Sequence, residues 1–316
     1  MNPLVVASLF PVVALIAVGF LAGRLGWIRA SSIKDLSNLI FLLLTPALLF
    51  RTMSKVHVEQ LDFKPVAAYF LAAFVLFFGM LLVKGWSRRA IVIALASTFS
   101  NTVMIGIALI GLLYGPAGQV TLFTLISLHA LVLLTLATVL LELAVAREQR
   151  ASVNAADQPP RHAVLTVLMA MKSALLHPVP LPIIVGLLFA QTGLEIPEVL
   201  DRPLELLATA FGPLALVLVG VTLAFTPVGS YWRQALGLSV VKNFALPVLV
   251  YGLCMLLGVG GLPMTVMVVA ASLPIGANVF LFSQRYEVAQ DLVTASVAVS
   301  TALAMISVTL ILLLVV

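Results

Sequence analysis

Charged side chains are scarce in this 316-residue sequence: Asp, Glu, Lys and Arg make up 9% of it, and apolar residues make up 62%. A soluble globular domain carries roughly 25% charged residues, so this composition excludes an ordinary soluble protein. The apolar residues form repeated runs of about 20 residues, the length at which a helix crosses the ~30 Å hydrocarbon core of a bilayer. The short alternating segments of a β-barrel are missing. The sequence therefore predicts an all-α polytopic membrane protein.

Cysteine is almost absent, because Cys254 is the only one. A single cysteine excludes an intramolecular disulfide, and its apolar surroundings predict a buried structural thiol. The sequence also begins without the basic region of a cleavable signal peptide, so we expect the first apolar run to be a retained helix.

The residue patterns of enzymes and ATP-driven pumps are missing too. No cluster of His, Cys or carboxylate residues has metal-ligand spacing, and no Gly-rich phosphate loop precedes a Lys-Ser/Thr pair. No Ser/His/Asp or two-carboxylate arrangement lies at one membrane depth. We therefore expect no enzymatic activity, no cofactor and no metal. The net charge of +5 is attributed to basic loops rather than to nucleic-acid binding.

Ten membrane-spanning helices can be drawn between clear breaks such as Gly115-Pro116 and Gly260-Gly261. They are expected at residues 3–23, 34–53, 65–84, 90–113, 119–145, 178–193, 203–225, 232–257, 263–284 and 289–316. Of the 17 basic residues, twelve fall in loops on one side, four in loops on the other, and Lys242 lies inside a span. The positive-inside rule then places both termini outside, which is periplasmic for a bacterial inner-membrane protein.

The long polar stretch 146–162 divides the spans into five and five. We expect a first repeat at 1–145, a cytoplasmic loop at 146–177 that includes an interfacial connecting helix at 163–176, and a second repeat at 178–316. An odd number of spans per half requires the second repeat to be inverted.

The fourth helix of each half contains helix-breaking or polar residues near its middle. These are Ser100, Asn101, Thr102 and Gly106 in span four, and Pro274, Gly276 and Asn278 in span nine. Paired discontinuous helices indicate a transport site, and their half-helix N-termini suit an anion. The alternative is that the two breaks serve helix packing alone.

Two ionisable residues are expected within the membrane. Lys242, beside Asn243, lies deep in span eight with no carboxylate at similar depth, so we expect it to meet an anionic substrate. The alternative is a lysine held by backbone carbonyls. His129, near Ser127 in span five, is expected to be a neutral histidine bonded to a hydroxyl or, alternatively, a proton relay; Asn243 is a further site-lining candidate.

Several segments together resemble the auxin efflux carrier family, whose bacterial members include malonate and malate permeases. The matching segments are Pro11 to Gly19 with Gly23, Thr45 to Phe50, Ser100 to Thr102 with Gly106, His129 before Leu141-Glu142, Lys242 with Pro247, and Leu273 to Asn278. The resemblance covers essentially the whole chain. It implies a fold like that of bile-acid and sodium/proton transporters, in which spans 1, 2, 6 and 7 form a scaffold and spans 3–5 with 8–10 form a core. It also implies crossed helices four and nine and a homodimer. The paired intramembrane aspartates of sodium/proton antiporters are absent here.

The favoured interpretation is a secondary active transporter of a small organic anion, such as malonate or malate, working by elevator-type alternating access with a coupling proton or sodium ion. One alternative is a sodium-coupled carrier of a bulkier amphipathic anion, as in bile-acid transporters. Another is a membrane protein that transports nothing, either a sensor or an enzyme. Apart from the substrate and the coupling ion, the expected partners are membrane lipid and a second copy of the chain.

Overall fold

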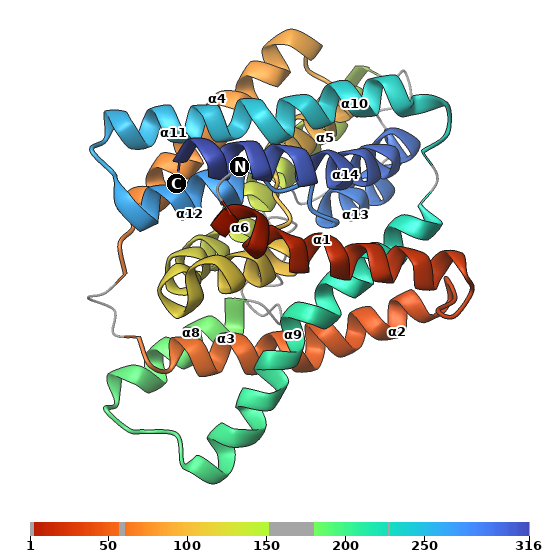
Figure 1. Cartoon of the computed structure of the whole chain (residues 1–316). Helices are drawn as coiled ribbons and strands as arrows, with labels where there is room; N and C mark the ends of the chain where they lie inside the picture. Colours follow the sequence, from red (N-terminus) through yellow and green to blue (C-terminus); the bar gives the residue numbers. More distant parts are fainter. Residues whose placement is uncertain (1–2, 57–60, 152–179, 227, 316) are drawn as a thin grey trace.

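The computed structural model describes residues 3–56, 61–151, 180–226 and 228–315. Within these ranges the regular structure is helical, and β pairing is limited to one isolated bridge between Ser100 and Ile275 (Figure 1). The connecting helix expected at 163–176 lies outside the described residues. The all-α prediction is confirmed for the part of the chain that the structure describes.

The helices of the described ranges follow one another in this chain order. The first part contains α1 (Pro3–Arg24), α2 (Ser32–Leu39), the π-turn η1 (Ile40–Leu44), α3 (Thr45–Met53), α4 (Lys64–Lys84) and α5 (Arg88–Thr98). The middle contains the π-turn η3 (Thr102–Gly106), α6 (Ile107–Ala151), α8 (Pro180–Gln191) and α9 (Glu198–Phe225). The last part contains the 3-10 turn η4 (Gly229–Tyr231), α10 (Trp232–Val240), the π-turn η5 (Val241–Ala245), α11 (Leu246–Leu256), α12 (Gly261–Ser272), α13 (Asn278–Arg285) and α14 (Gln290–Val315).

Among the described residues, six helical stretches are long and apolar enough to cross a membrane. They are Ser32–Met53, Lys64–Lys84, Thr102–Val145, Glu198–Phe225, Gly229–Leu256 and Gln290–Leu314, and shorter apolar helices cover Phe10–Arg24, Leu181–Gln191 and Gly261–Ser272. The long stretch is not one straight helix, because Gly115 inside it has φ 57° and ψ −152°. Pro116 follows directly, so the chain turns at the break expected from the sequence. The chain is a multi-pass membrane protein.

Two helices contain a π-turn just before a proline. The turn η1 precedes Pro46, and η5 precedes Pro247. Proline lacks an N–H and its ring crowds the preceding turn, so local widening of the helix relieves the clash. At the first of these turns the Thr45 hydroxyl donates to the carbonyl of Ile40 at 2.8 Å. The second turn carries Lys242 and Asn243 into the protein interior.

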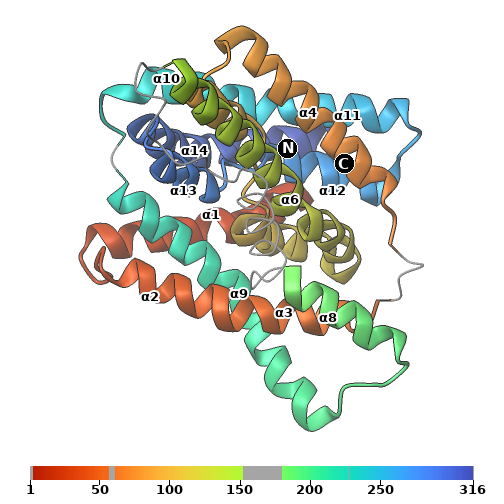
Figure 2. The same cartoon turned by 180° about the vertical axis from the view of Figure 1, so that it is seen from behind.

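The helices divide into two groups by their contacts. We call α1, α2, α3, α8 and α9 the first group, and α4, α5, α6 and α10 to α14 the second group. Helix α1 packs along α9, and α3 packs against both α8 and α9. In the second group α10 packs along α14, and α11 packs against α4 and α12. In Figures 1 and 2 the first group lies in the lower part of the molecule and most of the second group lies above it.

Helices α1 and α9 cross at a contact that only glycine allows. A Cβ atom on Gly19 would lie 2.0 Å from the carbonyl oxygen of Val217, and one on Gly220 would lie 2.0 Å from that of Ile16. Small residues let helix backbones approach closely in a membrane, where van der Waals packing drives helix association. Near one end of the same group, the Arg51 guanidinium of α3 makes two bonds to the Asp201 carboxylate of α9, at 2.7 and 2.9 Å. The first group is therefore joined both by close backbone packing and by an ion pair.

Candidate functional site

The two predicted helix breaks meet in space. Helix α5 ends at Thr98 and the chain resumes as η3 at Thr102, whereas α12 ends at Ser272 and α13 begins at Asn278. Between these ends, the Asn101 N–H donates to the Pro274 carbonyl at 2.8 Å, and the Gly276 N–H donates to the Phe99 carbonyl at 2.9 Å. We call residues 99–102 the first break and residues 273–278 the second break, counting the first residue of the helix that follows each. Each break supplies hydrogen-bond partners to backbone groups of the other, as non-helical chain within a membrane requires.

Gly276 allows this close approach. A Cβ atom there would lie 2.7 Å from the ring of Phe99 and 3.1 Å from the carbonyl oxygen of Ser100. The ring and the carbonyl both belong to the opposite break, so a larger residue at position 276 would push the two breaks apart. This explains why a glycine stands at this point of the second break.

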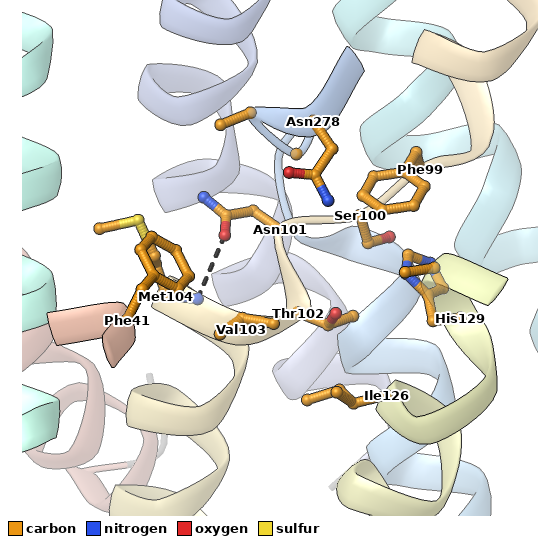
Figure 3. Close-up of a pocket in the computed structure, with 13 residues that line it drawn as sticks. Phe41, Phe99, Ser100, Asn101, Thr102, Val103, Met104, Ile126, His129 and Asn278 are labelled. Carbon is orange, nitrogen blue, oxygen red and sulfur yellow. Dashed lines mark hydrogen bonds between the residues drawn. The ribbon is translucent and has the colours of Figure 1, made fainter. Parts of the chain in front are cut away.

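A small cavity of about 70 Å³ lies at the meeting point. Six of the predicted site residues line it: Ser100, Asn101, Thr102, His129, Gly276 and Asn278. Its remaining lining residues are Phe41, Phe99, Val103, Met104, Ile126, Ala130 and Ala277. Figure 3 shows Asn101 and Asn278, which come from different breaks, extending toward the same space. The structure therefore brings together the polar residues of both breaks.

The N-terminal ends of two helices border this cavity. Asn101 is the residue before η3, and its side-chain oxygen accepts a 3.3 Å bond from the N–H of Met104 (Figure 3). Asn278 begins α13, which has no side-chain cap. Several first-turn N–H groups of these helices are already bonded to nearby carbonyls or to the Asn101 side chain, but the helix dipole adds partial positive charge at both ends. The cavity is therefore suited electrostatically to a negatively charged group.

His129 lies on one wall of the cavity and is bonded to a hydroxyl. Its Nε2 atom is 3.3 Å from the hydroxyl of Tyr69 on α4, and that hydroxyl is 2.8 Å from the Ser100 hydroxyl. The sequence placed Ser127 beside His129, but the Ser127 hydroxyl donates to the Thr124 carbonyl at 2.8 Å. Tyr69 was missed because it lies in an otherwise apolar span, where a tyrosine is unremarkable without its partner. The Tyr69 hydroxyl thus links the imidazole of His129 to Ser100 in the first break.

The other four predicted site residues lie near the cavity without lining it. Lys242 is fully buried, and its Nζ donates to the carbonyls of Ala271 and Leu273, both at 2.7 Å. Asn243 donates through Nδ2 to the Ser300 carbonyl at 2.9 Å. Pro274 contributes its carbonyl to the contact between the breaks. A Cβ atom on Gly106 would lie 2.9 Å from the Leu273 side chain, so its small size serves packing.

The placement of Lys242 corresponds to the alternative considered for it, in which backbone carbonyls hold the lysine. None of the ion pairs formed by the described residues includes it. Its ammonium stabilises the C-terminal end of α12, where carbonyls lack helical partners. A direct contact between Lys242 and an anion in the cavity has no support in this arrangement.

A second and much larger cleft, of about 760 Å³, lies between the two helix groups. Its walls come from α1, α3 and α9 of the first group and from α6 of the second. Arg51 and Lys55 are its two basic lining residues. Among the described residues, no group of three or more His, Cys, Asp or Glu side chains could hold a metal ion.

Comparison with known proteins gives two matches. A family model described as "Membrane transport protein" matches residues 4–312. The chain is also 29% identical over 307 residues to a protein of Rhizobium meliloti (strain 1021) whose description reads "Putative malonate transporter". That alignment covers 95% of this chain and 92% of the other protein. Both matches extend over nearly the whole sequence, including the two helix breaks.

Proposed function

Because this chain belongs to the family of membrane transport proteins that includes the auxin efflux carriers, we propose that it is a secondary active transporter of a small organic anion. Short carboxylates such as malonate or malate are the proposed substrates. The similarity to the Rhizobium meliloti protein supports this substrate class. The proposal makes the cavity between the two breaks the binding site.

One observation carries the proposal: two helix N-termini and two asparagine side chains border one cavity. Half-helix N-termini hold the carboxylate of the substrate in other transporters with broken helices. The side chains of Asn101 and Asn278 supply N–H donors that match carboxylate oxygens. A dicarboxylate has one carboxylate for each break, so a short spacer between its two carboxylates fits this arrangement.

The small size of the cavity favours a small anion over a bulky amphipathic one. At about 70 Å³, it has no room for a steroid-sized substrate in this conformation. The large cleft between the helix groups would then be the entrance. By the distribution of basic residues, Arg51 and Lys55 face the outside, so the cleft would open to the outside. Both are ion-paired with Asp201, so the proposal gives them no role in attracting the substrate.

The architecture we propose has ten spans in two inverted repeats, 1–145 and 178–316, in a bacterial inner membrane with both termini outside. The first helix group corresponds to the scaffold and the second to the moving core of an elevator-type transporter. A homodimer would form through the scaffold. The two groups meet along the large cleft, which is where a sliding boundary would lie. His129 supplies a protonatable group at the cavity wall, so a proton is a candidate coupling ion.

Uptake by purified protein in liposomes tests the proposal. We expect saturable uptake of radiolabelled malonate that unlabelled malate reduces and that malonamide, the neutral diamide, does not. Taurocholate uptake that requires sodium would instead favour the carrier of bulky amphipathic anions. No uptake of any short carboxylate by folded protein, under imposed proton and sodium gradients of either direction, would refute transport of small organic anions.

A further inference from the structure

The ammonium group of Lys242 lies where the last carbonyls of α12 converge. Lys242 is in the π-turn η5, and its side chain is fully buried. Both of its described hydrogen bonds, to Ala271 and Leu273, go to backbone carbonyl oxygens at 2.7 Å. A buried charge in a membrane protein is costly and has a functional role by default.

Carbonyls at the end of a helix have no intrahelical donor and carry partial negative charge. At the end of α12, donors come from other parts of the chain: the Ser307 hydroxyl bonds the Ser272 carbonyl at 3.4 Å, and the Asn101 N–H bonds the Pro274 carbonyl. The Ala271 and Leu273 carbonyls depend on Lys242. A single cation therefore satisfies two of these oxygens.

Carbonyl oxygens at the end of a broken helix are also the groups that hold coupling sodium ions in secondary transporters. The next residue in η5, Asn243, carries a buried side-chain oxygen, Oδ1, that has no donor among the described residues. Its Nδ2 is occupied by the Ser300 carbonyl. Ser300 also accepts from the Ile275 N–H through its hydroxyl, at 3.1 Å, so this amide is tied to the second break.

We propose that the Lys242 ammonium is a resident cation that takes the place of a coupling sodium ion at the end of α12. Transport by this chain is then independent of sodium, because the positive charge that holds the second break together is covalently attached. Lys242 acts as a positioning residue: it fixes the end of α12, and thereby Gly276 and Asn278, without touching the substrate. The transport part of this inference rests on the proposed function, whereas the cation site itself does not.

Two substitutions separate the charge of Lys242 from its volume. Lys242→Ala removes the charge and leaves space beside the two carbonyls, and Lys242→Met removes the charge but fills the space. Lys84→Ala serves as the matched control, because Lys84 is exposed at the end of α4. Purified proteins are compared in sodium chloride, methylammonium chloride and choline chloride at equal ionic strength. The readouts are the thermal melting temperature Tm and malonate uptake in liposomes.

We expect wild type and Lys84→Ala to show the same Tm and the same uptake in all three salts. Lys242→Ala should lose at least tenfold in uptake in choline and regain part of its uptake and Tm in sodium or methylammonium, which fit the vacated space. Lys242→Met should be impaired without regaining either property, because its side chain fills that space. Choline is too large to enter, so it provides the baseline.

Two results would overturn the inference. One is a wild-type uptake that falls tenfold or more when choline replaces sodium. The other is a Lys242→Ala protein with wild-type uptake and Tm in choline. If neither Lys242 variant folds, the comparison of wild-type uptake in sodium chloride and in choline chloride still tests the inference. A wild type that transports no carboxylate would refute the proposed function alone, since the Tm comparison needs no substrate.

Discussion

The backbone N–H of Asn101 donates to the carbonyl of Pro274 across the meeting point of two broken helices, at 2.8 Å. Pro274 has no N–H of its own, so the reciprocal bond is made two residues later, from Gly276 to Phe99. The two bonds fix the order and spacing of the residues that line the cavity. A change in either break is therefore transmitted to the other.

The side chains of Asn101 and Asn278 are expected to be required for transport. Asn101→Leu and Asn278→Leu should each abolish malonate uptake while folded protein remains in the membrane. Leucine has a similar size but offers no N–H to a carboxylate, and at position 101 it also removes the acceptor for Met104. Asn38→Leu is the matched control, because Asn38 is an exposed helical asparagine outside the cavity. Near-normal uptake in both site variants would show that the breaks serve packing only.

Enlarging Gly276 is expected to separate the two breaks. Gly276→Val places a Cβ atom where the Phe99 ring lies within 2.7 Å, and overpacking of this kind costs about 1–3 kcal/mol of stability. The Tm in detergent should fall and uptake should be lost. Gly252→Val in α11 meets open space, so its Tm should stay the same or rise slightly. Equal Tm values for the two variants would contradict the close contact at Gly276.

The pair of Arg51 and Asp201 is expected to join α3 to α9. Both side chains are about a quarter exposed, and the geometry is bidentate, so a small favourable coupling should appear at low salt. A double-mutant cycle with Arg51→Gln and Asp201→Asn, read as Tm, measures it. High salt should reduce the coupling through screening. Glu148→Gln removes an ion pair between α5 and α6 that shares no residue with this cluster, so it should not change the coupling. A coupling of zero at low salt would refute the link.

The orientation in the membrane can be tested with single cysteines. In a Cys254→Ser background, an impermeant thiol reagent added to intact cells should label His57→Cys and Glu198→Cys. It should not reach Arg88→Cys or Asn154→Cys. The expectation follows from the concentration of basic residues on one side. Permeabilised cells serve as the control for labelling efficiency. Labelling of position 154 in sealed cells would contradict the predicted orientation.

The sequence was sufficient to predict an all-helical membrane protein, because apolar runs and Gly/Pro breaks act locally; the count of ten spans stays a prediction. The turn at Gly115-Pro116 and the two interrupted helices were predicted correctly from residues at the breaks themselves. The gathering of Asn101 and Asn278 at one cavity required the additional assumption that the breaks cross. Matching breaks in the two halves supported that assumption.

The partners of buried polar groups could not be predicted in the same way. Lys242 was expected to face a substrate because no carboxylate lay at its depth, yet backbone carbonyls of α12 hold it. Every residue has a carbonyl, so the sequence carries no sign of which ones lack a donor. The bond between Tyr69 and His129 was not foreseen either, because it depends on how α4 and α6 face each other.

The contact between the two breaks is made by main-chain atoms, and this leaves the neighbouring side chains free to diverge. Backbone hydrogen bonds from Asn101 and Gly276 persist whatever polar side chain stands at positions 100, 101 or 278. Mutations at those positions can therefore alter the preferred cargo without dismantling the crossing. Under the proposed function, carriers for differently shaped anions can then arise by few substitutions at these positions, whereas a larger residue at position 276 would collide with the opposite break.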